Sequence, residues 1–181
     1  MVFCGKPVFE DVKHKADRAI IIGGGESLRG YDFRETTDFP GAVITVNNCI
    51  FHLPRADYWM TVDPMWQNEP QPALKHKRYT TYYYCAFPDL EKDKWSVPFY
   101  TTTRRTHYLE RIVPENEDSY QLQEDRKKIT TGDSIYGAIG LAYHMGVKKI
   151  LLLGVDVYGY GHWYDRNAPY NAYKQKDDKF D

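Results

Sequence analysis

The sequence has few of the features that mark a disulfide-stapled, membrane-spanning or nucleic-acid-binding protein. Its three cysteines, Cys4, Cys49 and Cys85, show no CxxC pair, which argues against a disulfide framework or a cysteine zinc site and for a reducing compartment. No apolar run approaches the roughly 18 residues that a membrane span needs. The net charge is −1, so the chain as a whole does not attract nucleic acid or anionic lipid. Residues 1–15 contain acids and no apolar core, so we expect no secretory signal and a cytoplasmic protein.

The length allows one domain with a substantial core. A chain of 181 residues lies within the roughly 100–200 residues of a single domain. We expect a polar arm over residues 1–17, one domain over residues 18–165 and a polar tail over residues 166–181. Sixteen tyrosines are unusually many, and most are expected at half-buried strand positions. The sequence leaves the oligomeric state open.

Short apolar runs predict a series of strands. Such runs, when bounded by turn residues, are typical of buried strands. The predicted strands cover residues 18–23, 42–47, 58–63, 78–85, 99–103 and 148–156. The charged stretch over residues 115–128 predicts a surface helix or a loop.

One helix is clearly predicted before the last strand. Apolar residues recur at helical spacing and would form one stripe: Ile135, Ala138, Ile139, Ala142 and Met145. Gly146 follows where a C-terminal glycine belongs. Helix followed by strand is half of a βαβ unit, so we expect an α/β fold: a single Rossmann-like domain whose mostly parallel sheet has helices on both faces.

Ligands of such sheets bind beyond the carboxyl ends of the strands, and several predicted strands end in suggestive residues. The first strand runs into the turn Gly23-Gly24-Gly25, with Ser27 behind it, where backbone N–H groups can approach a phosphate or ribose. The turn matches neither GxGxxG nor a Walker A loop, and an ordinary tight turn is the alternative.

Amides and carboxylates follow other strands. Asn47 and Asn48 end the second strand and can bind a base or sugar hydroxyl, or cap the next turn. Asp63 and Asp156 end the third and the last predicted strands. Their carboxylates can hold a Mg²⁺ that bridges phosphates, bind sugar hydroxyls, or cap a helix or tie down a loop.

Two further segments carry candidates. Thr130, Thr131 and Gly132 lead into the predicted helix, where hydroxyls and N-terminal N–H groups form either an anion pocket or an N-cap without a ligand. A loop rich in glycine and aromatics follows Asp156 and contains the last three candidates, Tyr158, His162 and Tyr164. The histidine is a candidate general acid or base.

In order and spacing, these pieces resemble a known family. Ile21-Ile-Gly-Gly-Gly-Glu-Ser-Leu28, Val46-Asn-Asn48, Val62-Asp-Pro64, Ile129-Thr-Thr-Gly132 and Met145-Gly-Val-Lys-Lys-Ile-Leu-Leu-Leu-Gly-Val-Asp156 form the series. It resembles the bacterial sialyltransferases of glycosyltransferase family 42 and their relatives, the motility-associated glycosyltransferases and the 6-hydroxymethylpterin diphosphokinase-like proteins. The resemblance covers about residues 18–165, with residues 67–125 poorly matched.

The resemblance implies a Rossmann-like domain that binds a nucleotide or nucleotide-sugar donor. In the sialyltransferases, the positions matching Gly24, Asn47, Asp63 and Thr131 contact the nucleotide. The tyrosines matching Tyr158 and Tyr164 lie on the leaving phosphate, where phenol donors would stabilise developing charge. The family's general base lies in a later lid, which we expect this sequence to lack.

Departures from the family pattern keep other functions open. Glu26 stands where the relatives have proline, Gly24 where the sialyltransferases have asparagine, and Asp63 also replaces an asparagine, which favours a metal. The sequence therefore predicts a nucleotide-dependent transferase, most closely glycosyltransferase-like. The alternatives are a Mg²⁺-dependent pyrophosphokinase that uses ATP, with Asp63 and Asp156 on the metal, and a nucleotide-binding protein without turnover.

Overall fold

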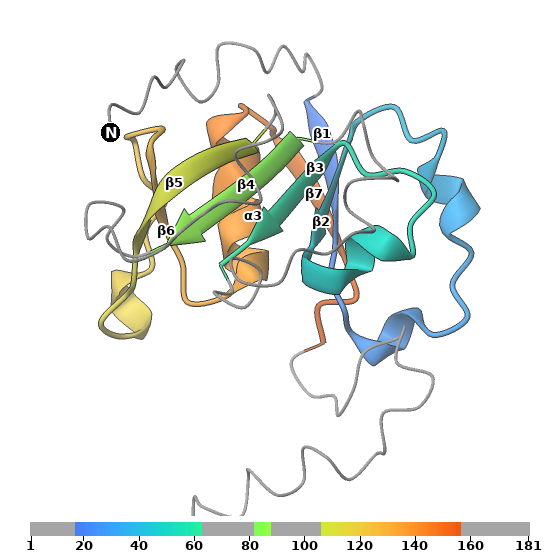
Figure 1. Cartoon of the computed structure of the whole chain (residues 1–181), viewed down its shortest axis with the longest axis horizontal. Coiled ribbons are helices and arrows are strands. Elements are labelled where there is room, and N and C mark those ends of the chain that lie inside the picture. Colours follow the sequence, from blue (N-terminus) through green and yellow to red (C-terminus); the bar gives the residue numbers. More distant parts are fainter. Residues whose placement is uncertain (1–16, 63–81, 88–105, 157–181) are drawn as a thin grey trace, which may run out of the picture.

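The computed structural model describes residues 17–62, 82–87 and 106–156, which form an α/β fold built on one parallel sheet (Figure 1). The strands are β1 (Arg18–Ile22), β2 (Ala42–Val46), β3 (Tyr58–Thr61), β4 (Tyr82–Phe87), β5 (Thr106–Ile112), β6 (Lys128–Thr130) and β7 (Lys149–Leu153). The helical segments are the α-helix α3 (Ser134–His144) and the 3-10 turns η1 (Glu26–Leu28), η2 (Phe33–Thr36), η3 (Asn47–Phe51) and η5 (Glu117–Ser119). No helix in these ranges is both long and apolar enough to cross a membrane.

The order of the strands reverses once. Across the sheet the order is β6-β5-β4-β3-β2-β1-β7, and all six neighbouring pairs are parallel. The chain therefore adds strands in one direction from β1 to β6 and then crosses back to place β7 on the other side of β1. In open parallel sheets, the carboxyl ends on either side of such a reversal are where ligands bind.

The central strands are buried on both faces because their residues are almost all apolar. β2, for example, has the sequence AVITV, and all five of its residues are buried. Residues that alternate along β1, β2 and β3 pack on one face against α3, among them Ile21, Ile44 and Met60. The intervening residues, among them Ile20 and Val43, pack on the other face against the 3-10 turns.

The predicted helix is confirmed together with its ends. The Asp133 carboxylate accepts a hydrogen bond from the Tyr136 N–H and caps α3. Gly146 has a φ of 78°, and its N–H and that of Val147 donate to the carbonyls of Tyr143 and Ala142. This is the Schellman pattern that a glycine at this position favours.

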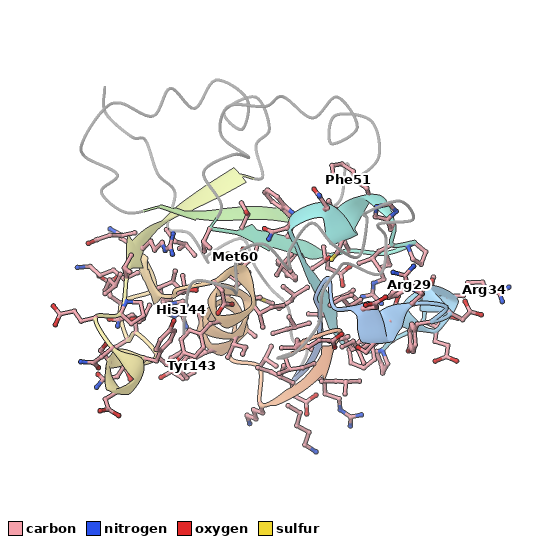
Figure 2. All side chains as sticks on the ribbon, turned by 90° about the horizontal axis from the view of Figure 1, so that it is seen from below. Arg29, Arg34, Phe51, Met60, Tyr143 and His144 are labelled. Carbon is pink, nitrogen blue, oxygen red and sulfur yellow. The ribbon has the colours of Figure 1, made fainter. Side chains whose placement is uncertain are left out.

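Several expectations about secondary structure need correction or lie outside the described residues. Helices on both faces are not confirmed: among the described residues, the α-helix α3 lies on one side of the sheet, and the 3-10 turn η3, which includes Phe51, lies on the other (Figure 2). The strand expected over residues 78–85 corresponds to β4, which covers Tyr82–Phe87; residues 78–81 lie outside the described residues. Of the two alternatives for residues 115–128, the structure agrees with the loop, since η5 and turns cover this stretch up to Lys128, where β6 begins. The strand expected over residues 99–103 lies outside the described residues.

Candidate functional site

The carboxyl ends of the parallel strands bring most of the described candidates to one edge of the sheet. β1 leads into the glycine turn, β2 into Asn47, and β6 into Thr131 and Gly132. α3 begins at the same edge, because it follows β6 directly. Contacts across the edge support this grouping: the Ser134 hydroxyl, in the first turn of α3, lies 3.1 Å from the Asn47 Oδ1 at the end of β2.

Asn47 lies at the end of β2 and is held by three hydrogen bonds. Its Oδ1 accepts hydrogen bonds from the Thr61 hydroxyl at 2.8 Å and the Ser134 hydroxyl at 3.1 Å, and its carbonyl accepts one from the Trp59 indole at 2.8 Å. The backbone φ of Asn47 is +46°, a left-handed conformation that asparagine tolerates better than most residues. Among the described residues, nothing accepts from the Asn47 Nδ2 group, so that amide is the donor left for a ligand.

The start of α3 adds further donors at the same place. The Val62 N–H at the end of β3 donates to the Ser134 hydroxyl at 3.2 Å, which ties β3 to the helix. The first N–H groups of a helix have no partner within the helix. In the described part of the chain, the N–H groups of Ser134 and Ile135 donate to no other residue. Together with the helix dipole, they favour an anion at this end of α3.

The glycine turn packs against the end of β7. The Gly23 N–H donates to the Leu153 carbonyl and the Gly25 N–H to the Gly154 carbonyl, both at 2.8 Å. A Cβ on Gly23 would lie 2.4 Å from the Gly154 oxygen. This close packing explains in part why residue 23 is a glycine, whatever ligand the turn binds.

Asp156 closes the same turn. Its carboxylate accepts from the Ser27 N–H at 2.8 Å and from the Ser27 hydroxyl at 2.6 Å. A Cβ on Gly25 would lie 2.5 Å from the Asp156 Cγ, so the side chain fills the space beside that glycine. The predicted site residues Ser27 and Asp156 are thus in direct contact, and the Asp156 carboxylate stabilises the glycine turn.

Thr130 ends β6, Thr131 and Gly132 connect it to α3, and the side chains of both threonines are used within the protein. The Thr131 hydroxyl donates to the Asp133 carbonyl, and the Gln123 side-chain amide donates to the Thr130 hydroxyl. A Cβ on Gly132 would lie 2.2 Å from the Tyr120 hydroxyl. The Tyr120 ring meets the Tyr136 ring edge to face, with centroids 4.7 Å apart, so an aromatic pair stands beside the start of α3.

Arg111 is a residue of this edge that the sequence did not reveal. Its guanidinium donates to the carbonyls of Thr131 and Gly132, each at 3.0 Å, and to that of Val62 at 3.3 Å. It therefore holds the segment before α3 against the end of β3 and places a positive charge there. A single arginine within a strand gives no sequence signal for such a role, because its partners are backbone carbonyls.

For five candidates, the described structure gives no contact that indicates a role. Asn48 is exposed. Asp63, Tyr158, His162 and Tyr164 lie outside the described residues. Within the described ranges, no three His, Cys, Asp or Glu side chains cluster in a way that could hold a metal ion.

Comparison with known proteins adds no family. No protein-family model, no curated protein and no solved structure matches the chain. What can be assigned is a class: an α/β protein with a parallel sheet. Amide, hydroxyl and helix N-terminal donors meet at the carboxyl edge of this sheet.

Proposed function

We propose that the carboxyl edge of this Rossmann-like sheet binds a nucleotide, and that the protein is a nucleotide-dependent group transferase related to the sialyltransferase-like glycosyltransferases. The observation that carries the proposal is the junction of Asn47, Ser134 and the start of α3. It combines the Asn47 side-chain amide with two helix N–H groups, none of which donates to another described residue; these donors suit a ribose or base and a phosphate respectively. It lies one strand away from the reversal between β1 and β7, at the edge of the sheet where such sheets bind nucleotides.

Two neighbouring features support a nucleotide over a simple anion. The Tyr120–Tyr136 pair offers aromatic surface beside the same helix end, and 37% of the Tyr120 surface is exposed. Aromatic rings stack favourably on nucleic-acid bases. The Arg111 guanidinium adds positive charge close to the proposed phosphate position.

The use of Asp156 within the protein favours a transferase over the pyrophosphokinase. The pyrophosphokinase would need Asp156 beside Asp63 on Mg²⁺, but each oxygen of the Asp156 carboxylate already accepts a hydrogen bond from Ser27 and holds the glycine turn. The transferase needs no such ion, because Tyr158 and Tyr164 would donate to the departing phosphate. Added Mg²⁺ should therefore change nucleotide affinity little. A strict requirement for Mg²⁺ would instead favour the pyrophosphokinase.

Asn47→Asp tests the binding site. Aspartate keeps an oxygen for the Thr61 and Ser134 hydroxyls and tolerates the left-handed backbone, so the fold should stay intact. It replaces the outward donor with negative charge, so nucleotide affinity should fall at least about tenfold. A thermal-shift panel of nucleotides and nucleotide sugars measures this, since a ligand at 100 times its dissociation constant adds about 2.7 kcal/mol.

Asn116→Asp is the matched control. Asn116 caps η5 beside β5, three strands away from β2, and aspartate caps as well as asparagine. This variant adds the same charge and should bind nucleotides like the wild type. A panel in which no nucleotide stabilises the wild-type protein would remove the proposed function altogether.

Tyr158→Phe and Tyr164→Phe test whether group transfer occurs. If the phenols donate to the leaving phosphate, each variant should keep its affinity for the donor and lose at least about tenfold in turnover. Turnover is measured as release of the nucleotide from the best-binding nucleotide sugar, and His162→Gln tests the candidate acid or base in the same assay. Wild-type turnover in both phenylalanine variants would contradict the role of the tyrosines. A wild-type protein that binds a nucleotide without converting it would be a binding protein.

A further inference from the structure

β7 has the composition of a central strand but lies at the edge of the sheet. Its sequence is KILLL, and four of its residues are exposed. Large aliphatic side chains are in contact with solvent here, with exposed fractions of 37% for Ile150, 52% for Leu151, 42% for Leu152 and 37% for Val155. These four residues account for nearly half of the exposed large hydrophobic side chains in the described part of the chain.

The outer side of β7 also has backbone groups that pair with no described strand. β7 ends the strand order and pairs with β1 along its other side, and no described strand pairs with its outer side. A long apolar edge strand readily pairs with a strand of another chain, and proteins usually protect such edges with charge, brevity or a cover. The opposite edge is protected in this way, because β6 has only three residues and begins with a lysine.

The charges at the two ends of β7 indicate the direction in which a partner strand would run. Lys148 and Lys149 stand at its start and Asp156 lies just beyond its end, all exposed. An antiparallel copy of the same segment brings the basic end of each strand toward the acidic end of the other. A parallel copy would place Lys149 opposite Lys149, which is unfavourable.

We infer that the β7 edge is the interface of a homodimer, in which β7 pairs antiparallel with β7 of a second copy and joins the two sheets into one. A two-fold axis at Leu151 pairs the whole strand with itself, Lys149 opposite Leu153 and Ile150 opposite Leu152. Such a self-complementary contact closes after two copies. It also removes the exposed apolar edge from water.

Leu151→Lys tests the interface through the mass of the protein in solution. The wild-type chain of 21.2 kDa should have twice that mass by light scattering, and the variant should have the monomer mass at the same concentration. Leu151 is half exposed, so lysine should leave the melting temperature of the monomer almost unchanged. Leu122→Lys is the matched control, since Leu122 is 42% exposed and lies away from β7, and it should remain dimeric.

A cysteine cross-link tests the register without disturbing the fold. At a two-fold axis through Leu151, the two Leu151→Cys residues would have Cα atoms about 4.5–5.5 Å apart, within the range of a disulfide. Lys149→Cys would place its pair about 13 Å apart, four residues along the strands, and should not cross-link. The wild-type protein, with its own three cysteines, serves as the blank.

Three results would overturn the inference. One is a wild-type monomer over about a hundredfold range of concentration, since a dimer must respond to mass action. Another is a dimer that persists in Leu151→Lys and fails to cross-link through Leu151→Cys, which would place the interface elsewhere. The third is a wild-type monomer whose β7 amides resist hydrogen exchange, which would show that residues of the same chain cover the strand. None of these results bears on nucleotide binding.

Discussion

Replacing Arg55 by alanine should destabilise the protein by about 3 kcal/mol, although the residue lies in a loop. Its guanidinium donates to the carbonyls of Thr37, Phe39 and Gly41 at 2.7–3.1 Å and pairs through two nitrogens with the Asp57 carboxylate. This set uses all five N–H donors of the side chain. Alanine would remove the donor of three carbonyls. It would also leave the partly buried Asp57 carboxylate with the Val43 N–H, at 2.9 Å, as its remaining donor in the described part of the chain. Equilibrium urea unfolding, read as a shift in the midpoint, measures the loss.

Lysine at this position should recover only part of the loss. It keeps the positive charge but has a single nitrogen, which cannot reproduce the planar fork that serves Asp57 and the loop carbonyls together. We expect Arg55→Lys to lie between the wild type and Arg55→Ala. A lysine variant as stable as the wild type would mean that charge alone matters here.

Arg34 provides the control, because it forms the same kind of pair in water. Arg34 donates through two nitrogens to the Asp32 carboxylate, with a shortest distance of 2.6 Å, and its hydrogen bonds lower the pKa of Asp32 to about 2. Its side chain is 88% exposed, against 27% for Arg55, and Figure 2 shows Arg34 pointing away from the protein. Solvent-exposed ion pairs contribute little to the free energy of unfolding. Arg34→Ala should therefore leave the urea midpoint unchanged.

The elements predicted from the sequence are those whose apolar residues follow the pattern of their burial in the fold. β1, β2, β3 and α3 were predicted to within about two residues at each end, because both faces of the strands and one stripe of the helix are apolar. β5 and β6 were missed. β5 has the sequence THYLERI, in which polar and charged residues interrupt the apolar ones, and β6 is only three residues long. Neither has the continuous apolar run that marks a strand buried on both faces.

The parts of the site that could be predicted follow from strand order, and the rest depends on contacts distant in sequence. Asn47, Thr131 and the glycine turn were expected at one edge, because parallel strands all end on the same side. The start of the helix was expected there as well, but the bond between Ser134 and Asn47, 87 positions apart, was not, and neither was Arg111. The exposure of β7 could not be predicted either, since its apolar composition is typical of a central strand.

Gly23 should tolerate alanine least of the glycines near the site, because its neighbour is backbone. A Cβ would lie 2.4 Å from the Gly154 oxygen and 3.0 Å from the Ile135 Cδ1. Relief requires the ends of β1 and β7 to separate, which strains the hydrogen bonds from Gly23 to Leu153 and from Gly25 to Gly154. We expect Gly23→Ala to lower the free energy of unfolding by about 3 kcal/mol or more.

Gly30→Ala separates this packing from the conformational freedom of glycine. Gly30 has a φ of 83°, and no atom lies within 4 Å of the place a Cβ would take, so alanine there meets only backbone strain, about 1 kcal/mol. Urea unfolding of the two variants, with nucleotide binding measured on each, tests two views of the glycine turn. If residue 23 is a glycine because β7 packs against it, the Gly23→Ala variant should be less stable than the wild type, and its nucleotide affinity should fall as a consequence. If Gly23→Ala keeps the stability of the wild type and loses only nucleotide affinity, the ligand is what excludes the side chain, and the tight contact with Gly154 must relax at little cost.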